Sequence, residues 1–206
     1  GSVAVSAVAL GVTASIWGYQ YLSQPTRALA PTIPSAIIVD QQQPVPLVSE
    51  SAPFLQALRD AADASGDGVT QLYPVTVEPE GDRYATAAEI LTALSLRAPG
   101  TFQRDIDRIT VLARNGESVG IVLEFNNFET ALGGLYRWED DIVSDFTPLL
   151  GTSPTTRFTD TMRNNRDIRV STRADGSELL YTFIDRTTLL IATDRALIGE
   201  VLNRQQ

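Results

Sequence analysis

The second half of the chain alternates apolar and polar residues in short runs, a pattern that predicts half-buried strands. Two runs, 109–113 and 119–125, flank Asn115-Gly116, the dipeptide that most strongly favours a tight hairpin. Three further runs lie at 167–172, 178–184 and 188–193, separated by the turns Ala174-Asp175-Gly176 and Asp185-Arg186. We therefore expect the strands of this half to pair antiparallel.

A helical pattern separates the first two of these strands from the rest. Between residues 128 and 149, apolar residues recur every three or four positions and so form one stripe on a helix. The stripe consists of Phe128, Leu132, Leu135, Trp138, Ile142, Phe146 and Leu149. We expect Trp138, at its centre, to be buried against the sheet. The alternative is that Trp138 is exposed and anchors a partner, since tryptophan is enriched in interface hot spots.

Three further helices are predicted from their starting signals. Residues 53–64 follow Ser51, a plausible N-cap, and Thr86 with Glu89 forms a capping box in front of a second helix. Asp194 is suited to cap a closing helix that carries Leu197, Val201 and Leu202.

Two strands are predicted in the first half, at 36–39 and 70–77. Pro74 lacks a backbone N–H, so we expect its strand to lie at a sheet edge or to contain a bulge. The order of all these elements predicts an α+β fold, with a mostly antiparallel sheet and helices packed on one face.

The chain begins with twenty residues that carry no formal charge, from Val3 to Leu22. A helix of that length spans roughly 30 Å, the hydrocarbon thickness of a bilayer. Trp17, Tyr19 and Tyr21 lie at its end, where aromatic rings favour the membrane interface. Residues 1–22 are therefore predicted to be a transmembrane anchor, with a buried core helix or a strand as the alternative.

A proline-containing linker is predicted over residues 23–35, followed by a globular domain over 36–206. Within the linker, Ala28-Leu29-Ala30 has the form of a signal-peptide cleavage site, but Pro31 disfavours cleavage. Pro25 and Pro31 also argue against a pilin-like subunit, because they should stop the apolar helix before the globular head. We expect further sequence to precede residue 1.

Composition excludes several classes of function. The net charge is −9, and no charged residue precedes Arg27, so the domain is acidic and nucleic acid is not expected as a partner. The chain has no Cys, His or Lys. It therefore lacks a serine–histidine–aspartate triad, a thiol nucleophile, a structural zinc site and a Schiff-base lysine. We expect no catalytic, cofactor-binding or metal-ligating residues, and no cofactor.

A combination of residues between 69 and 204 carries a resemblance to other proteins. These residues are Arg97-Ala98-Pro99, Gly134-Leu135, Trp138-Glu139, Phe158, Asp160, Asn165, Asp167, Arg169, Val170, Leu180-Tyr181, Phe183, Asp185-Arg186, Thr188-Leu189 and Ile191. In this combination the chain resembles uncharacterised single-span membrane proteins of candidate phyla radiation bacteria. The resemblance implies a cytoplasmic N-terminus, one span and an external globular domain, and it implies no activity and no site residue.

One segment has part of the pattern of a calcium-binding loop. Asp63, Ser65, Asp67 and Gly68 match its positions 1, 3, 5 and 6, but Pro74 stands at position 12, where a bidentate glutamate should close the site. A helix end followed by a turn is therefore preferred.

Acidic residues cluster on the long predicted helix, at Glu139, Asp140, Asp141 and Asp145. Paired carboxylates can act on a glycosidic bond, but consecutive acids on a helix fan outward, so a solvated surface is preferred.

The polar stretch 163–169 contains Arg169, which we expect to form a buried structural ion pair with Asp160 or Asp167. The alternative is that this stretch is a recognition edge. Asp185-Arg186 is interpreted as a turn only.

These observations predict a non-enzymatic, membrane-anchored, extracytoplasmic domain that binds a protein partner or organises the cell envelope. The alternative is a carboxylate-based hydrolase of cell-wall glycan, which would need a cleft with two carboxylates roughly 5 to 9 Å apart.

Overall fold

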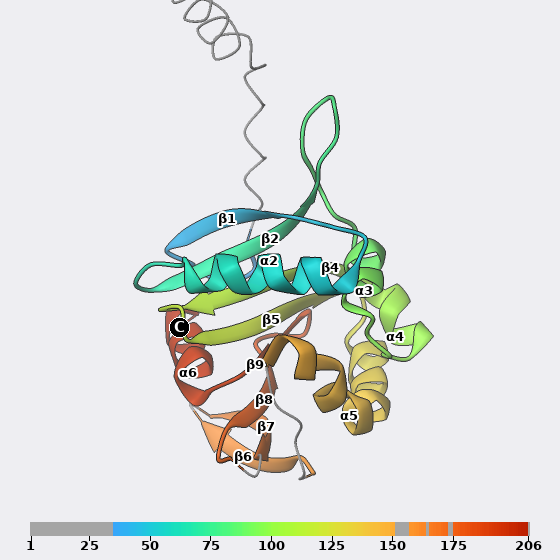
Figure 1. Ribbon diagram of the computed structural model, residues 1–206. Coiled ribbons are helices and arrows are strands. Elements are labelled where there is room, and N and C mark those ends of the chain that lie inside the picture. Colours follow the sequence, from blue (N-terminus) through green and yellow to red (C-terminus); the bar gives the residue numbers. More distant parts are fainter. Residues whose placement is uncertain (1–34, 151–156, 164, 173–174, 206) are drawn as a thin grey trace, which may run out of the picture.

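The computed structural model describes residues 35–150, 157–163, 165–172 and 175–205. The chain forms, in order, β1 (Gln41–Pro46), α2 (Ser51–Asp63), β2 (Val69–Thr76), β3 (Arg83–Tyr84), α3 (Ala87–Leu94), α4 (Gly100–Asp105), β4 (Ile106–Arg114), β5 (Ser118–Phe125), α5 (Phe128–Leu150), β6 (Thr159–Arg163), β7 (Arg166–Thr172), β8 (Glu178–Phe183), β9 (Thr188–Ala192) and α6 (Arg195–Arg204). The predicted α+β class is confirmed (Figure 1).

The described strands form one mixed and mostly antiparallel sheet. Its order is β1–β2–β4–β5–β9–β8–β7–β6, with β3 paired to the end of β2. β1 and β2 are parallel and are connected through α2, whereas the other described pairs are antiparallel. Because β5 pairs with β9 at the centre, the two halves of the chain share one sheet.

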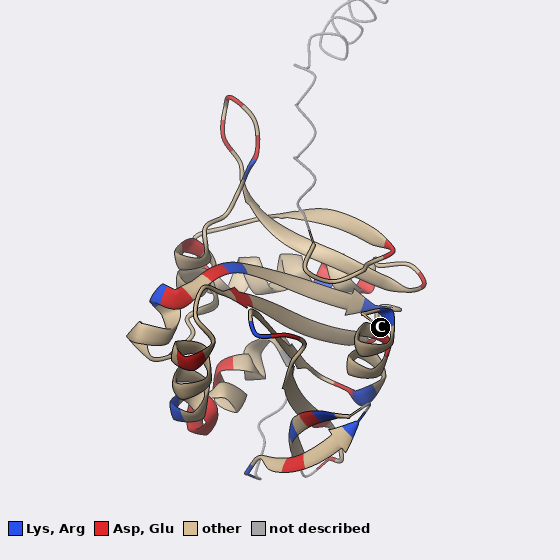
Figure 2. Ribbon diagram, turned by 180° about the vertical axis from the view of Figure 1, so that it is seen from behind, with Lys and Arg blue, Asp and Glu red and all other residues tan. Residues whose placement is uncertain are grey.

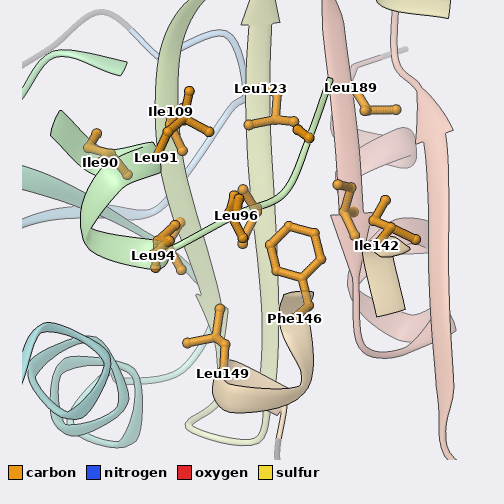
Figure 3. Packing of buried hydrophobic residues seen from close by; sticks show 14 of the residues in the cluster. Ile90, Leu91, Leu94, Leu96, Ile109, Leu123, Ile142, Phe146, Leu149 and Leu189 are labelled. Carbon is orange, nitrogen blue, oxygen red and sulfur yellow. The ribbon is translucent and has the colours of Figure 1, made fainter. Parts of the chain in front are cut away.

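One face of the sheet is covered by α2, α3, α4 and α5, which enclose the larger hydrophobic core. Alternate strand residues such as Val111, Ile121 and Leu189 point into this core. Figure 3 shows the arrangement, with Leu94 of α3 and Phe146 of α5 among the side chains that meet over the sheet. The long helix therefore docks through its apolar stripe, as predicted, and Trp138 is buried.

The closing helix α6 packs on the opposite face, so the expectation of helices on one face is wrong. Leu112, Val122 and Leu190 directly follow residues that face the larger core, so they point to the other face of the sheet. There they form a second cluster with Leu197 and Val201 of α6. The central strands are thus apolar on both faces, which is the pattern of strands buried on both sides. Covering the second face is what requires a further helix.

Local turn and cap signals are confirmed. Asn115 and Gly116 adopt positive φ angles of 53° and 70°, which a hairpin turn between β4 and β5 requires. Thr86 and Glu89 form both bonds of the capping box at the start of α3. Asp194 accepts a hydrogen bond of 2.8 Å from the Leu197 backbone N–H at the start of α6.

The segment before the first helix differs from expectation. The first strand is Gln41–Pro46, and not 36–39. Ile37 instead packs into the α6 core, whereas its neighbour Ile38 is exposed. The helix α2 begins at Ser51, and Glu50 stands at the N-cap position without a side-chain hydrogen bond. Within the run 36–39, Ile37 is therefore buried by helix packing and not by strand pairing.

Pro74 lies within an internal strand, contrary to the predicted edge or bulge. β2 pairs with β4 over Val69–Leu72 and with β3 over Val75–Thr76. Pro74 falls where the partner changes, so its missing N–H removes no bond from either antiparallel pairing.

The predicted anchor, Val3–Leu22, and residues 23–34 of the predicted linker lie outside the described residues. Within the part of the chain that the structure describes, no helix has the length and apolar character needed to cross a membrane.

Adjacent glycines in α5 offer a matched test of the helix packing. A Cβ on Gly134 would lie 2.5 to 2.9 Å from three side-chain atoms of the buried Phe102, whereas a Cβ on Gly133 would meet nothing within 4 Å. We expect Gly134→Ala to destabilise the fold by roughly 1 to 3 kcal/mol through overpacking. Gly133→Ala should stabilise it by roughly 0.5 to 1 kcal/mol, because alanine favours the helix. Urea midpoints that shift in the same direction for both variants would contradict this packing.

Candidate binding cleft

A cleft of about 920 Å³ lies between the first turns of α5 and the strands β6, β7 and β8. The helix contributes Phe128, Leu132 and Tyr136, which are spaced four residues apart and so share one side of the helix. The strands contribute Asp160, Thr161, Met162, Arg166, Asp167, Arg169, Tyr181, Thr182 and Phe183, and Asn165 lies in the turn between β6 and β7. The sheet thus forms the floor of the cleft and the helix forms a wall.

Strand periodicity brings alternate residues to the side of the sheet that faces α5. Asp160 pairs with Arg169 across β6 and β7, and Arg169 pairs with Tyr181 across β7 and β8. Directly opposed residues in antiparallel strands share one face. A carboxylate, a guanidinium and a phenol are therefore aligned across three strands beneath the helix.

Arg169 is the centre of this polar row. Its Nε and Nη2 donate to the two carboxylate oxygens of Glu139 on α5, at 2.9 and 2.7 Å. Its Nη1 donates to Oδ1 of Asp160 at 2.9 Å. The hydrogen bond to Asp160, followed by those to Glu139, raises the pKa of Arg169 above its ordinary value. Arg169 therefore remains cationic and ties the helix to the sheet.

Tyr181 completes the row. Its hydroxyl donates to Oε1 of Glu139, and its ring packs against Phe158 with a centroid distance of 5.1 Å. Burial, and then the hydrogen bond to Glu139, raises the pKa of Tyr181 well above its ordinary value. The phenol therefore stays protonated and acts as a hydrogen-bond donor.

Arg169 pairs with Asp160, as predicted, but this pair is not buried, because the Asp160 side chain is 78% exposed. Asp167 is not a partner of Arg169, and Glu139 is a second partner that the sequence interpretation missed. Glu139 was assigned to a solvated surface, but it lies four residues after Leu135 and three before Ile142 on α5. Its place on the flank of the apolar stripe was the signal that it faces the sheet.

The predicted solvated acidic surface is also wrong for Asp145, whose side chain is only 2% exposed. Its carboxylate accepts hydrogen bonds from Trp138 Nε1 at 2.7 Å, from the Arg97 backbone N–H at 2.8 Å and from Arg97 Nε at 2.7 Å. Asp145 therefore joins α5 to the segment between α3 and α4. Asp140 is exposed, as expected.

The segment from Asp63 to Gly68 packs against the β4–β5 turn. The Gly68 N–H donates to Asn115 Oδ1 at 3.0 Å, and the Gly116 N–H donates to Ser65 Oγ at 3.3 Å. No group of three or more carboxylates that could hold a metal ion occurs among the described residues. The arrangement is that of a helix end and a turn.

Asp185-Arg186 is a turn, as predicted, because Asp185 Oδ1 accepts from the Thr187 N–H at 2.7 Å. The sequence interpretation missed a second feature of it. The Arg186 guanidinium lies over the Phe128 ring, 5.3 Å from its centroid, and forms an ion pair of 3.6 Å with Glu129. Arg186 therefore lies against Phe128 of the helix wall, and its ion pair with Glu129 is exposed, with the two side chains 78% and 80% accessible.

Two carboxylates, Asp160 and Asp167, line the cleft, and a carboxylate pair in a cleft is what a glycan hydrolase would need. A general acid in such an enzyme is typically a carboxyl group kept neutral in an apolar pocket. The Asp160 side chain is 78% exposed and bound to a guanidinium. The cleft thus offers charge and hydrogen-bonding groups for binding more readily than it offers an acid and base pair.

Comparisons with protein-family models, with curated proteins and with solved structures found no match to this chain.

Proposed function

We propose that this chain is a non-catalytic, membrane-tethered module that binds a segment of another envelope protein in the cleft between α5 and β6–β8. The observation that carries the proposal is a pair of exposed apolar side chains on opposite sides of this cleft. Tyr136 on α5 is 57% exposed, and Met162 on β6 is 66% exposed. Covering apolar side chains that are exposed to water at a cleft lowers the free energy of the complex and so favours binding.

The rigidity of the cleft also supports binding. Arg169 and Tyr181 hold the helix wall to the strand floor through Glu139, so the two sides are fixed before a partner arrives. A preorganised site loses less conformational entropy on binding than a flexible one. The dimensions suit a short extended segment, since ligand clefts are commonly about 300 to 1,000 Å³.

The proposed tether rests on the charge-free run from Val3 to Leu22 and on the prolines that follow it. A helix over this run would be long enough to span a bilayer. Residues 23–35 would then separate the binding domain from the membrane surface.

Panning of phage-displayed random peptides tests the binding function. The target is the 206-residue chain in non-ionic detergent, compared with the double variant Tyr136→Arg/Met162→Arg. We expect related peptides to be enriched on the wild type and lost from the variant, because arginine at both positions removes the apolar contacts and obstructs the cleft.

The matched control is Val48→Arg/Val77→Arg, which makes the same chemical change at two exposed positions outside the cleft. It should retain the enriched peptides. The proposal is contradicted if no related peptides are enriched, or if they bind the Tyr136/Met162 variant as well as the wild type.

A further inference from the structure

We infer that the cleft recognises a cationic side chain, arginine or lysine, flanked by apolar residues in the bound segment. This inference rests on the proposed binding function and adds the chemistry of the partner to it. It follows from which charges of the cleft are compensated within the domain and which are not.

The central cation of the cleft, Arg169, is already compensated within the domain. Arg169 is bound by two carboxylates, Glu139 and Asp160. Arg166 donates from Nη1 to the Phe183 carbonyl at 3.5 Å. Arg186 beside the cleft is paired with Glu129 and stacked on Phe128. An anionic partner would therefore have to compete with Glu139 and Asp160 for Arg169, the central cation.

The carboxylates of the cleft are less occupied. Asp167 is exposed, and among the described residues no side chain forms a hydrogen bond or ion pair with its carboxylate. Asp160 accepts a hydrogen bond from Arg169 through Oδ1, and its side chain is 78% exposed. Figure 2 shows acidic and basic positions on the β6 and β7 ribbons.

The register of β6 and β7 places these two carboxylates close together. Asp160 opposes Arg169 and Met162 opposes Asp167, so Asp160 and Asp167 are diagonal neighbours on the face toward α5. Diagonal neighbours in an antiparallel pair have β-carbons roughly 7 to 8 Å apart or somewhat closer. A guanidinium or ammonium group between them can interact with both.

Met162 lies on the same face as these carboxylates, and Leu132 and Tyr136 stand across the cleft. A segment whose cation reaches Asp160 and Asp167 would therefore place its neighbouring side chains against apolar groups. The net charge of −9 further favours approach of a cationic segment over an anionic one.

Fluorescence polarisation with three blocked, labelled hexapeptides tests this inference on the full chain in non-ionic detergent. Each peptide has a central residue flanked by two leucines, and the central residue is arginine, glutamine or glutamate. We expect the order of affinity to be arginine, then glutamine, then glutamate. Asp167→Asn should weaken binding of the arginine peptide about tenfold, because it removes a charge-assisted hydrogen bond, and should leave the glutamine peptide unchanged.

Asp140→Asn is the matched control, because it removes one negative charge at an exposed position of α5 outside the cleft. It should leave the affinity for the arginine peptide unchanged. If the arginine and glutamine peptides bind equally and Asp167→Asn changes neither, the inference is overturned while binding in the cleft stands. If Tyr136→Arg fails to weaken any of the three peptides, the proposed binding function itself is overturned.

Discussion

Replacing Trp138 with alanine should leave the domain marginally stable or unfolded. The side chain is 1% exposed and packs between Phe102 and Phe146, with ring centroids 5.4 and 5.5 Å away. Truncation of a buried tryptophan costs roughly 3 to 5 kcal/mol, out of a total of roughly 5 to 15 kcal/mol for a domain. The burial also shows that the alternative of Trp138 as an exposed interface anchor is wrong.

Urea unfolding followed by circular dichroism measures this effect. Asp140→Ala, on the exposed side of the same helix, is the control and should shift the midpoint little. A Trp138→Ala variant that unfolds at the wild-type midpoint would show that Trp138 does not stabilise the core.

Replacing Asp145 with alanine should have the second largest effect. The substitution would leave three donors without their acceptor: the Trp138 indole N–H, the Arg97 backbone N–H and Arg97 Nε. Each buried donor left without an acceptor costs roughly 1 to 3 kcal/mol. The Trp138 indole N–H is buried, whereas the Arg97 side chain is 56% exposed and can be hydrated. The hydrogen bond to Asp145 raises the pKa of Arg97. Without Asp145 the guanidinium would lose this partner and still remain charged, because arginine is protonated at neutral pH whatever its surroundings.

Asp141→Ala is the control for Asp145→Ala, because both acids contact the same arginine. Asp141 lies 3.2 Å from Arg97 Nη1, but the two side chains are 48% and 56% exposed. An exposed pair contributes roughly 0 to 1 kcal/mol. If the two variants lost equal free energy of unfolding, the burial of Asp145 would not explain its contribution to stability.

The features that the sequence predicted correctly depend on short-range signals. Asn115-Gly116 specifies its own turn through positive φ angles, and Thr86 with Glu89 satisfies the donors of a helix start within four residues. The apolar stripe of α5 needs only helical periodicity to define the side that is buried. None of these inferences requires knowledge of which element packs against which.

The missed features depend on distant partners. β1 has the sequence QQQPVP and is held by parallel pairing with β2, a connection that polar composition does not indicate. β6 has the sequence TDTMR and is exposed along most of its length, so it lacks the alternation of a half-buried strand. Without β6 the cleft has no outer strand, and the floor of the site could not be predicted.

The burial of two acids on α5 was not predicted either, again because their partners are distant in the sequence. Whether a carboxylate on α5 is solvated depends on the donors that face it from elsewhere in the fold. Asp145 meets Arg97, 48 residues earlier, and Glu139 meets Arg169, 30 residues later. The clustering of four acids in sequence concealed that two of them point toward the protein.

Protection of an introduced thiol tests most directly whether the cleft is the binding site. The chain has no native cysteine, so a single substitution provides a unique probe. Met162→Cys places a thiol in the cleft, and Val77→Cys places one at an exposed position outside it. The alkylation rate of each variant is measured with and without the leucine-flanked arginine peptide. We expect the peptide to slow alkylation at position 162 and to leave position 77 unaffected. An unchanged rate at position 162 under conditions where the peptide is bound would contradict the cleft as the site.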